Sequence, residues 1–292
     1  MQTAEAVSHG AITIVNAMAT GKGAALGIDL HTRAKVTITD QPGTFVAKNL
    51  SDPKENNALA EITARDVFSR FRADKRFGAI IETESNIPVA VGLKSSSAAS
   101  NAVALASLRA LGRKAPDLGT VKIGVQASLR ARVTITGAFD DACACYFGGI
   151  VITDNTTRKI LKRFKPKRSL HVLIHVPKMK KYTRDVNPAS FSSITPFIKA
   201  AHREALAGDY WNAMSLNGLL YSIALDYDIT AATTALSSGA IAAGLTGKGP
   251  AVAAIVQESK REAVRDAWRK IKGQIIETSF NFSKASAKKV QA

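Results

Sequence analysis

The sequence predicts an α+β protein with two domains joined near residue 165. Its 292 residues, of which 46% are hydrophobic, suit one large domain or two of ordinary size. Segments with the alternation of strands are mixed with segments of helical spacing along the whole chain. A basic interruption, KPKRS at residues 165–169, separates two such mixed halves. We therefore assign residues 1–165 to an N-terminal domain and residues 166–292 to a C-terminal domain.

In the first half, apolar residues at helical intervals predict helices over residues 57–71 and 96–111. Gly112 suits the end of the second helix, and Asp117 suits the start of a third that runs to about residue 130. The other expected elements of this half are strands at 10–17, 34–39, 44–48, 78–82, 149–153 and 159–164, a glycine-rich loop at 20–27, an extended segment at 133–136 and a short helix within 137–149.

In the second half, Pro196 after Thr195, and Asp209, are start signals for two helices. The stretch GLTGKGP at 244–250 is expected to be an irregular interruption, and the tail at 281–292 is expected to be loose. The other expected elements are strands at 170–176, 251–257 and 274–279, and helices at about 196–207, 209–224, 229–242 and 261–271.

The charge balance raises the question of a nucleic-acid partner, because the net charge is +17 and the pI is about 10.0. Part of the excess is local: from Arg158 to Arg184 there are eleven Lys or Arg and no Asp or Glu. Aromatic residues make up only 6% of the chain and do not interleave with this segment, as base stacking usually requires. We therefore expect a phosphate-binding patch or a solvated basic face, and no nucleic-acid partner as the main function.

Other compositional features predict a cytoplasmic protein without a membrane partner. No apolar run is long enough for a membrane span, and the N-terminal MQTAEAVSHG lacks the basic start of a signal peptide. Cys143 and Cys145 are two residues apart, so they cannot easily pair with each other, and their spacing fits no zinc pattern. A reducing compartment is the expected location of such a chain.

The segment PVAVGLKSSSA at 88–98 combines a glycine and three serines at the start of an alanine-rich helix. Gly92 allows the backbone to approach a ligand closely, and Ser95, Ser96 and Ser97 fall on the first helical turn. There the backbone N–H groups and the helix dipole favour an anion, and a hydroxyl can also ligate Mg²⁺. Such a site suits a nucleoside triphosphate. An ordinary serine cap before a core helix is the alternative, and the residues alone leave both open.

Two common nucleotide-binding fingerprints are absent. Neither Gly-Lys pair, at 21–22 or at 247–248, has the distant glycine or the following Ser or Thr of a Walker A loop. Gly21 and Gly23 are followed by Leu26, where a dinucleotide-binding fingerprint has its third glycine. ATP is therefore expected to use another kind of loop.

Several stretches together resemble the GHMP kinase superfamily, which includes galactokinase, homoserine kinase, mevalonate kinase and phosphomevalonate kinase. The pattern P-x-x-x-G-L-x-S-S-x-A at 88–98 is similar to its ATP-binding motif. NAMATGKGAALGIDLHT at 16–32 occupies the place of the first motif, and LTGKGPAVAAIV at 245–256 resembles the third. TGAFDDA at 136–142 and TGKGP at 246–250 resemble the archaeal-type shikimate kinases in particular. The resemblance spans nearly the whole chain.

This resemblance implies a ribosomal-protein-S5-like N-terminal domain, a ferredoxin-like C-terminal domain and an active site in the cleft between them. It implies ATP as phosphoryl donor, Mg²⁺ as cofactor and shikimate as acceptor through its 3-hydroxyl, on the route to chorismate and aromatic amino acids. One alternative is another small-molecule GHMP kinase, acting on homoserine or a mevalonate-pathway substrate. A second, of another class, is an RNA-binding protein that uses the S5-like half.

The resemblance also implies roles for individual residues. It assigns Asp140 as the proton acceptor or the group that orients the acceptor hydroxyl, with Asp141 beside it as a second catalytic residue, a substrate contact or a metal ligand. A plain helix N-terminus is the structural alternative for this acid pair. The implied ATP-binding residues are Pro88, Val89, Ala90, Val91, Gly92, Leu93, Lys94, Ser95, Ser96, Ser97 and Ala98; those of the third motif are Thr246, Gly247, Lys248 and Gly249; those that bind substrate are Asn16, Asp29 and Thr136.

The metal ligands implied by the resemblance are incomplete. Many members of the superfamily carry a metal-binding glutamate about a dozen residues before the aspartate, but residues 118–139 contain no acid. Mg²⁺ would rely on Ser96, on Asp140 or Asp141, on waters and on ATP oxygens, which suits an ion that keeps several waters.

Recognition of the acceptor carboxylate calls for an arginine, because a guanidinium can bind a carboxylate through two hydrogen bonds. Arg33, Arg132 and Arg184 are candidates, and the sequence does not choose among them. Lys22 and Lys248 lie in glycine-rich loops, where they are candidates to steady phosphates, with solvated loop lysines as the alternative. Among the five histidines, His31 is singled out because it follows the first motif.

Overall fold

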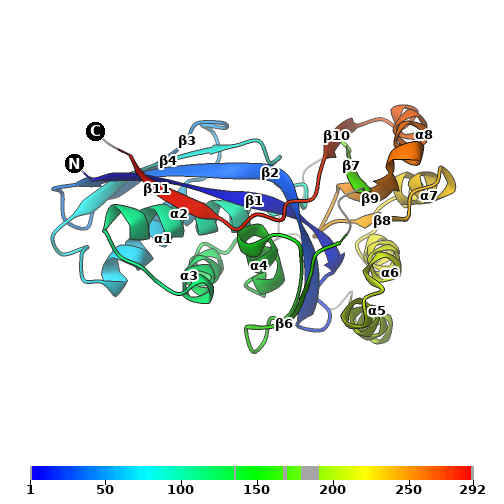
Figure 1. The fold of residues 1–292 in the computed structure, drawn as a ribbon, viewed down its shortest axis with the longest axis horizontal. Helices are drawn as coiled ribbons and strands as arrows, with labels where there is room; N and C mark the ends of the chain where they lie inside the picture. Colours follow the sequence, from blue (N-terminus) through cyan, green and yellow to red (C-terminus); the bar gives the residue numbers. More distant parts are fainter. Residues whose placement is uncertain (1, 135, 167–169, 179–190, 291–292) are drawn as a thin grey trace.

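The computed structural model describes residues 2–134, 136–166, 170–178 and 191–290. Its helices and strands form two sheets with helices packed on them, which confirms the predicted α+β class (Figure 1). The domain boundary at residue 165 stays a prediction.

The larger sheet has the strand order β11-β1-β2-β4-β3, with β5 and β6 attached beside the first part of β2. Its strands in the described part of the chain are β1 (Thr3–Val15), β2 (Lys22–Thr39), β3 (Phe45–Asn49), β4 (Gly78–Ser85), β5 (Ile150–Asp154), β6 (Lys159–Phe164) and β11 (Ser286–Val290). Helices cover one of its faces (Figure 1). They are α1 (Ala58–Arg70), α2 (Ser95–Ala110), α3 (Asp117–Arg130) and α4 (Phe139–Phe147).

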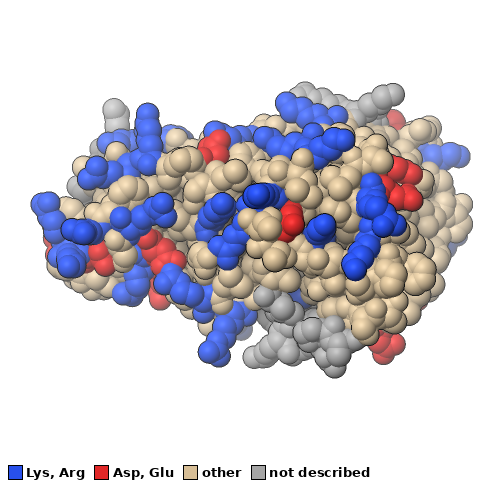
Figure 2. All heavy atoms as spheres, turned by 90° about the horizontal axis from the view of Figure 1, so that it is seen from below, with Lys and Arg blue, Asp and Glu red and all other residues tan. Residues whose placement is uncertain are grey.

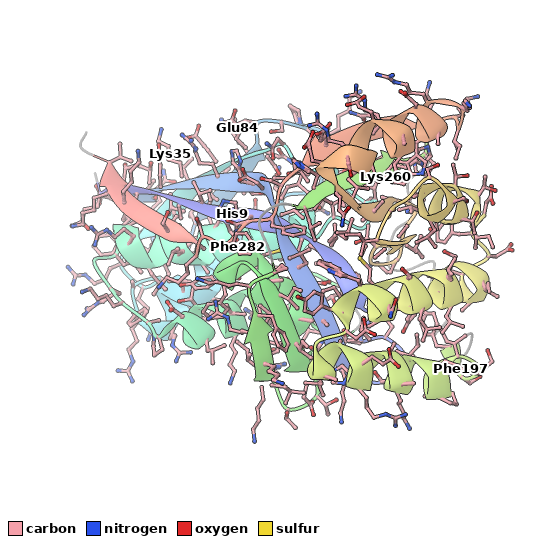
Figure 3. The ribbon with its side chains drawn as sticks, turned by 45° about the vertical axis from the view of Figure 1, so that its right-hand side comes forward. His9, Lys35, Glu84, Phe197, Lys260 and Phe282 are labelled. Atoms are coloured by element: carbon pink, nitrogen blue, oxygen red, sulfur yellow. The ribbon has the colours of Figure 1, made fainter. Side chains whose placement is uncertain are left out.

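The smaller sheet has the order β10-β7-β9-β8. Its strands are β7 (Leu170–Val176), β8 (Ala242–Leu245), β9 (Val252–Gln257) and β10 (Gln274–Thr278), and its helices are α5 (Thr195–Ala207), α6 (Tyr210–Ala224), α7 (Thr230–Ser237) and α8 (Glu258–Arg269). Side chains of β9 alternate between two cores: Val252 and Ala254 pack with α7 and α8, while Ala253 and Ile255 pack with α5 and α6. Burial on both faces explains why this strand is a continuous apolar run. Figure 3 shows α8, which carries Lys260, and α5, which carries Phe197, far apart across this half of the molecule.

One apolar core connects the two sheets. It contains Ile12 from β1, Phe139 from α4, Tyr221 from α6 and Ile255 from β9, all buried. The alanine-rich α2 lies against β1 and β2, and most of its residues are buried, because small side chains allow close approach to the sheet. This packing brings the start of α2 and the start of α4 toward the loop that follows β8.

Several expectations about the N-terminal strands were wrong in extent. β1 begins at Thr3, not at residue 10, and β2 is one strand from Lys22 to Thr39, not a short strand preceded by a loop at 20–27. Gly23 and Gly27 lie inside β2 because the strand passes very close to α4: a Cβ on Gly27 would lie 3.0 Å from the Cα of Gly148. These glycines are needed because other parts of the chain approach the strand closely. A glycine-rich sequence alone does not distinguish such a strand from a loop.

Other expectations were wrong because tertiary contacts decide them. The tail is not loose: β11 pairs with β1, from Thr3 opposite Val290 to Val7 opposite Ser286. The predicted helix at 229–242 ends as α7 at Ser237, and residues 242–245 form β8 on β9. The segment at 133–136 is no strand where described; residue 135 lies outside the described residues.

Candidate active site

A cavity of about 530 Å³ lies where the start of α2, the start of α4 and the loop after β8 meet. Residues from all three of the predicted motif segments line it, among them Asn16, Ser96 and Gly247, and so does Asp140. Other parts of its wall come from the start of α1, from the turn that joins α3 to α4 and from residues of the larger sheet. Segments that are far apart in the sequence therefore share one cavity, as the predicted site requires.

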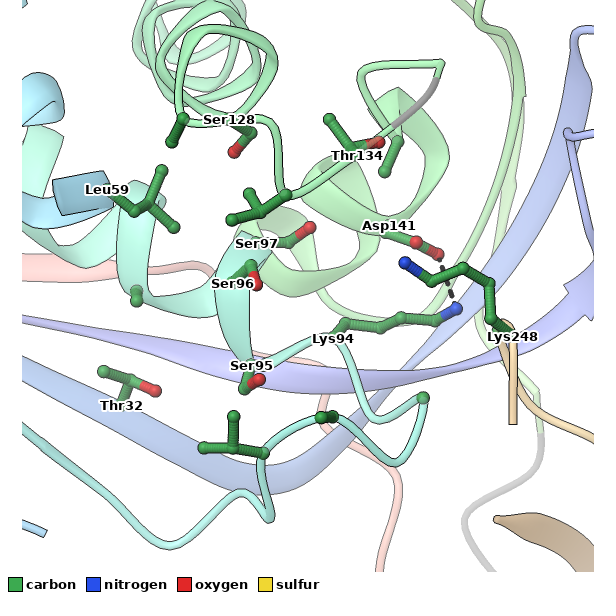
Figure 4. Close-up of a pocket in the computed structure, with 18 of the residues that line it drawn as sticks. Thr32, Leu59, Lys94, Ser95, Ser96, Ser97, Ser128, Thr134, Asp141 and Lys248 are labelled. Carbon is green, nitrogen blue, oxygen red and sulfur yellow. Dashed lines mark ion pairs between the residues drawn. The ribbon is translucent and has the colours of Figure 1, made fainter. Parts of the chain in front are cut away.

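The first turn of α2 faces this cavity (Figure 4). Ser95, Ser96 and Ser97 all line it, and the first turn contains no acidic residue. Lys94 precedes the helix in the left-handed conformation, with φ 66°, which side-chain-bearing residues seldom adopt. Backbone N–H groups and the helix dipole thus favour a bound anion at this point.

The loop before α2 is docked on the loop after β8. Gly92 has φ +96°, and a Cβ there would collide with the carbonyl oxygen of Thr246, so only glycine fits. The Thr246 hydroxyl donates to the Gly92 carbonyl oxygen at 3.0 Å, and the Ala251 N–H donates to the Val91 carbonyl oxygen at 3.1 Å. The predicted second and third motifs therefore form one rigid unit at the cavity.

Thr13 of β1 forms hydrogen bonds with both the loop before α2 and the loop after β8. Its hydroxyl accepts hydrogen bonds from the Lys94 ammonium at 2.7 Å and from the Gly247 N–H at 2.9 Å. Its own N–H donates to Thr246 Oγ1 at 3.0 Å. Thr13 was not among the predicted site residues, because a buried threonine in a strand has no local feature that distinguishes it from any other strand residue.

The acid pair lies at the start of α4. Asp141 Oδ1 is 3.1 Å from the Lys94 ammonium, and the two side chains are only 16% and 6% exposed (Figure 4). Asp140 is 4% exposed, and its Oδ1 accepts a hydrogen bond from Asn155 Nδ2 at 2.8 Å. Lys94 thus joins the start of α2 to the acid pair through a buried ion pair. Lys248 lines the cavity as well, and its side chain points toward the pair of Lys94 and Asp141 (Figure 4).

The electrostatic environment of Asp140 raises its pKa from the ordinary value of 3.8 to about 7. Burial is the main cause, and the neighbouring charge of Asp141 adds to it. The hydrogen bond from Asn155 and the charge of Lys94 oppose the rise. A carboxyl group with a pKa near 7 can accept a proton at neutral pH and release it later.

The predicted substrate-binding residues lie in different places. Asn16 lines the cavity, but its Oδ1 accepts from the Met18 N–H at 3.0 Å and its Nδ2 donates to the Gly247 carbonyl oxygen at 2.8 Å. Thr136 lines the cavity in the turn before α4. Asp29 is not part of the cavity wall: its side chain is 61% exposed and lies 4.0 Å from His9 Nε2.

Of the candidate arginines, Arg132 lines the cavity and Arg33 does not, while Arg184 lies outside the described residues. Lys22 and His31 are not part of the cavity wall either. Arg132 follows α3 with φ 56°, a left-handed turn that allows the chain to continue toward α4.

The donor set for a metal ion is small. The described residues contain no group of three or more His, Cys, Asp or Glu side chains that could hold one. The Ser96 hydroxyl and the acid pair share the cavity, which suits Mg²⁺ because this ion keeps waters and takes oxygen ligands from a nucleotide.

Two observations concern a membrane and a negatively charged partner. No helix in the described part of the chain has the length and apolar character that crossing a membrane requires. On the face seen from below, Lys and Arg are spread along the molecule among other residues (Figure 2).

Comparisons with known proteins match most of the length of this chain. The family model for the GHMP kinases N terminal domain matches residues 58–149, and that for GHMP kinases C terminal matches residues 198–273. The chain is 43% identical over 282 residues to a shikimate kinase of Methanosarcina mazei, covering 96% of this chain and 95% of that protein. It is 45% identical over 270 residues to a shikimate kinase of Pyrococcus furiosus, covering 92% and 96%.

Among solved structures, the mevalonate kinase of Methanococcus jannaschii superposes with a TM-score of 0.76 at 16% identity, covering 95% of this chain and 98% of that one. At this identity the likeness concerns the fold, and it confirms the fold class expected from the motifs.

Proposed function

The chain belongs to the GHMP kinase family, and from this premise we propose that it is a shikimate kinase, which transfers the γ-phosphoryl of ATP to the 3-hydroxyl of shikimate. This reaction belongs to the route to chorismate and the aromatic amino acids. The structural observation that carries the proposal is the buried pair of Lys94 and Asp141, which places an acid pair next to an anion-binding helix start in one cavity.

In the proposed reaction the acceptor hydroxyl oxygen attacks the γ-phosphorus of ATP. The bond from this phosphorus to the β–γ bridging oxygen breaks, ADP leaves, and the hydroxyl proton passes to the Asp140 carboxylate. The pKa of about 7 at Asp140 suits this transfer at neutral pH. Phosphoryl transfer depends mainly on positioning and charge neutralisation, which the rigid unit of the two loops supports.

We assign the phosphates of ATP to the loop and helix start at 88–98 and to the third motif at 246–249. Lys248 would neutralise phosphate charge there, while Lys94 keeps its ion pair with Asp141. The Ser96 hydroxyl and one carboxylate of the acid pair would hold Mg²⁺ together with waters, and the ion would supply further charge neutralisation at the phosphate oxygens.

For the carboxylate of shikimate we assign Arg132. In the described part of the chain no acidic side chain pairs with its guanidinium, whereas Lys94 of the same cavity is already paired with Asp141. A guanidinium on the cavity wall can bind a carboxylate through two parallel hydrogen bonds. Thr136, in the same turn, is the assigned contact for a substrate hydroxyl.

We place this activity in the cytoplasm. Cys143 and Cys145 are both buried and not joined in a disulfide, a state that fits a reducing compartment.

A coupled assay of ADP release, with shikimate, homoserine and mevalonate offered separately, tests the proposal. We expect Mg²⁺-dependent turnover with shikimate alone. Turnover with homoserine or mevalonate, and none with shikimate, would assign the chain to another branch of the family. The RNA-binding alternative predicts no turnover with any acceptor, together with RNA binding that weakens steeply as salt rises.

A further inference from the structure

We propose that Asn155, which follows β5, is a positioning residue that holds the Asp140 carboxylate in the orientation needed to accept the acceptor's proton. This inference rests on the proposed function, because it concerns the same reaction. Asn155 stands in the turn between β5 and β6, outside all of the motifs, and only 5% of it is exposed.

The Asn155 amide can take only one orientation. The backbone N–H of Asp140 donates to Asn155 Oδ1 at 3.1 Å, and the Thr153 hydroxyl donates to the same oxygen at 2.7 Å. Because a backbone N–H can only donate, the amide oxygen must face it, and the amide nitrogen then faces the carboxylate. Asn155 Nδ2 donates to Asp140 Oδ1 at 2.8 Å. Two hydrogen bonds in opposite directions therefore fix the Asp140 side chain relative to its own backbone.

The second oxygen of Asp140 is confined from the other side. A Cβ on Gly23 of β2 would collide with Asp140 Oδ2, so the carboxylate lies directly against the bare backbone of that strand. With Oδ1 bound to Asn155 and Oδ2 against Gly23, the plane of the carboxylate has little freedom to rotate. Asp140 lines the cavity in this orientation.

Asn155 is itself firmly anchored. Its N–H donates to the carbonyl oxygen of Gly21 at 2.8 Å, which ties it to the start of β2. The β2–β5 pairing, from Lys22 opposite Asp154 to Leu26 opposite Ile150, holds the two strands in register. The position of the proton acceptor is thus set by the sheet and not only by α4. Small errors in the position of a reacting group lower the rate strongly, so this support should matter for turnover.

Asn155→Ala tests the role, in comparison with wild-type protein whose turnover with shikimate is measured first. We expect kcat to fall about 10- to 100-fold, the range for loss of a hydrogen bond to a charged group, while KM for ATP and for shikimate stays within about twofold. Asp154→Ala is the matched control, because Asp154 stabilises the same turn by accepting from the Thr157 N–H at 2.9 Å and does not contact Asp140. It should keep kcat within about twofold.

A double-mutant cycle separates positioning from a general structural effect. If Asn155 acts through Asp140, then Asn155→Ala in an Asp140→Asn background should lower the remaining kcat by less than about twofold. Equal fold-losses in both backgrounds would overturn the proposal, and so would an unchanged kcat in the single variant. If Asn155→Ala does not fold, as judged by its melting curve, Thr153→Val replaces it: this variant removes the hydroxyl that orients the amide and should show the same coupling in a smaller loss. Absence of wild-type turnover with shikimate would instead contradict the proposed function.

Discussion

Replacing Asp140 by asparagine should abolish most turnover and at the same time stabilise the fold. The substitution keeps the shape of the side chain but removes its charge and its capacity to accept a proton. Loss of a general base usually costs about 10²–10⁴ in turnover, and we expect this range for kcat with shikimate. Binding of ATP should change little, because the phosphates are assigned to other residues.

The stability change follows from the pKa of Asp140. Its folded-state pKa of about 7 lies above the ordinary 3.8, so the folded protein binds the proton more tightly than the unfolded chain does. Below pH 3.8 the Asp140 carboxyl is protonated in both states and does not lower the free energy of unfolding of the wild type. As pH rises toward 7, the free energy of unfolding falls, because the unfolded chain releases the proton more easily than the folded protein. The difference corresponds to about 4 kcal/mol at pH 8, as an upper limit, at about 1.36 kcal/mol per pH unit. Asparagine carries no charge, so the free energy of unfolding of the variant should not fall in this way.

Chemical denaturation of both proteins at pH 8 and at pH 4 measures this difference, alongside the coupled assay for turnover. We expect Asp140→Asn to be more stable than wild type at pH 8 and close to it at pH 4. Asp266→Asn is a suitable control, since the Asp266 side chain is 59% exposed on α8. Equal stability of wild type and variant at pH 8 would refute the electrostatic argument, and near-normal turnover would refute the catalytic assignment.

Three further substitutions probe the rest of the site. Ser96→Ala should lower turnover and leave the melting temperature nearly unchanged; wild-type turnover at saturating ATP and Mg²⁺ would exclude a ligand role. Gly23→Ala puts a Cβ against Asp140 Oδ2, so kcat should fall about tenfold or more while ATP still raises the melting temperature; an unchanged kcat would show that the carboxylate tolerates displacement. Arg132→Met should raise KM for shikimate about 10- to 100-fold with KM for ATP within about twofold, as measured by initial rates, and an effect on ATP alone would move Arg132 to the phosphates.

Local signals were sufficient for many of the helices and strands. The extent of α3 (Asp117–Arg130) was predicted as observed, because helical spacing acts within a few residues. The capping role expected of Asp117 was wrong: Pro116 is the N-cap, and no side chain caps this helix start. The serines at 95–97 were expected on a first helical turn, and α2 begins there at the cavity wall, while anion binding at this turn stays a prediction.

Predictions were wrong where the structure of a segment depends on contacts with distant parts of the chain. Gly23 and Gly27 suggested a loop, but they lie in β2 where the strand passes against Asp140 and α4. The tail was expected to be loose because it is polar, yet β11 pairs with β1. A polar strand at the edge of a sheet forms through hydrogen bonds to the backbone of a neighbouring strand. The sequence around it does not show which strand that neighbour is.

Local patterns along the chain predicted the α+β class and the helix start at the serines, and the resemblance to a known family pointed to the acid pair at 140 and 141. Which other groups lie against these residues depends on how the sheets and helices pack. Thr13 joins Lys94 across 81 positions of the chain and Thr246 across 233, and Asn155 reaches Asp140 from a turn outside every motif. The physical reason is that a hydrogen bond acts over about 3 Å in space, whatever the separation along the chain. Spacing in sequence therefore predicts an element, while packing of the sheet and helices decides which side chains share a cavity.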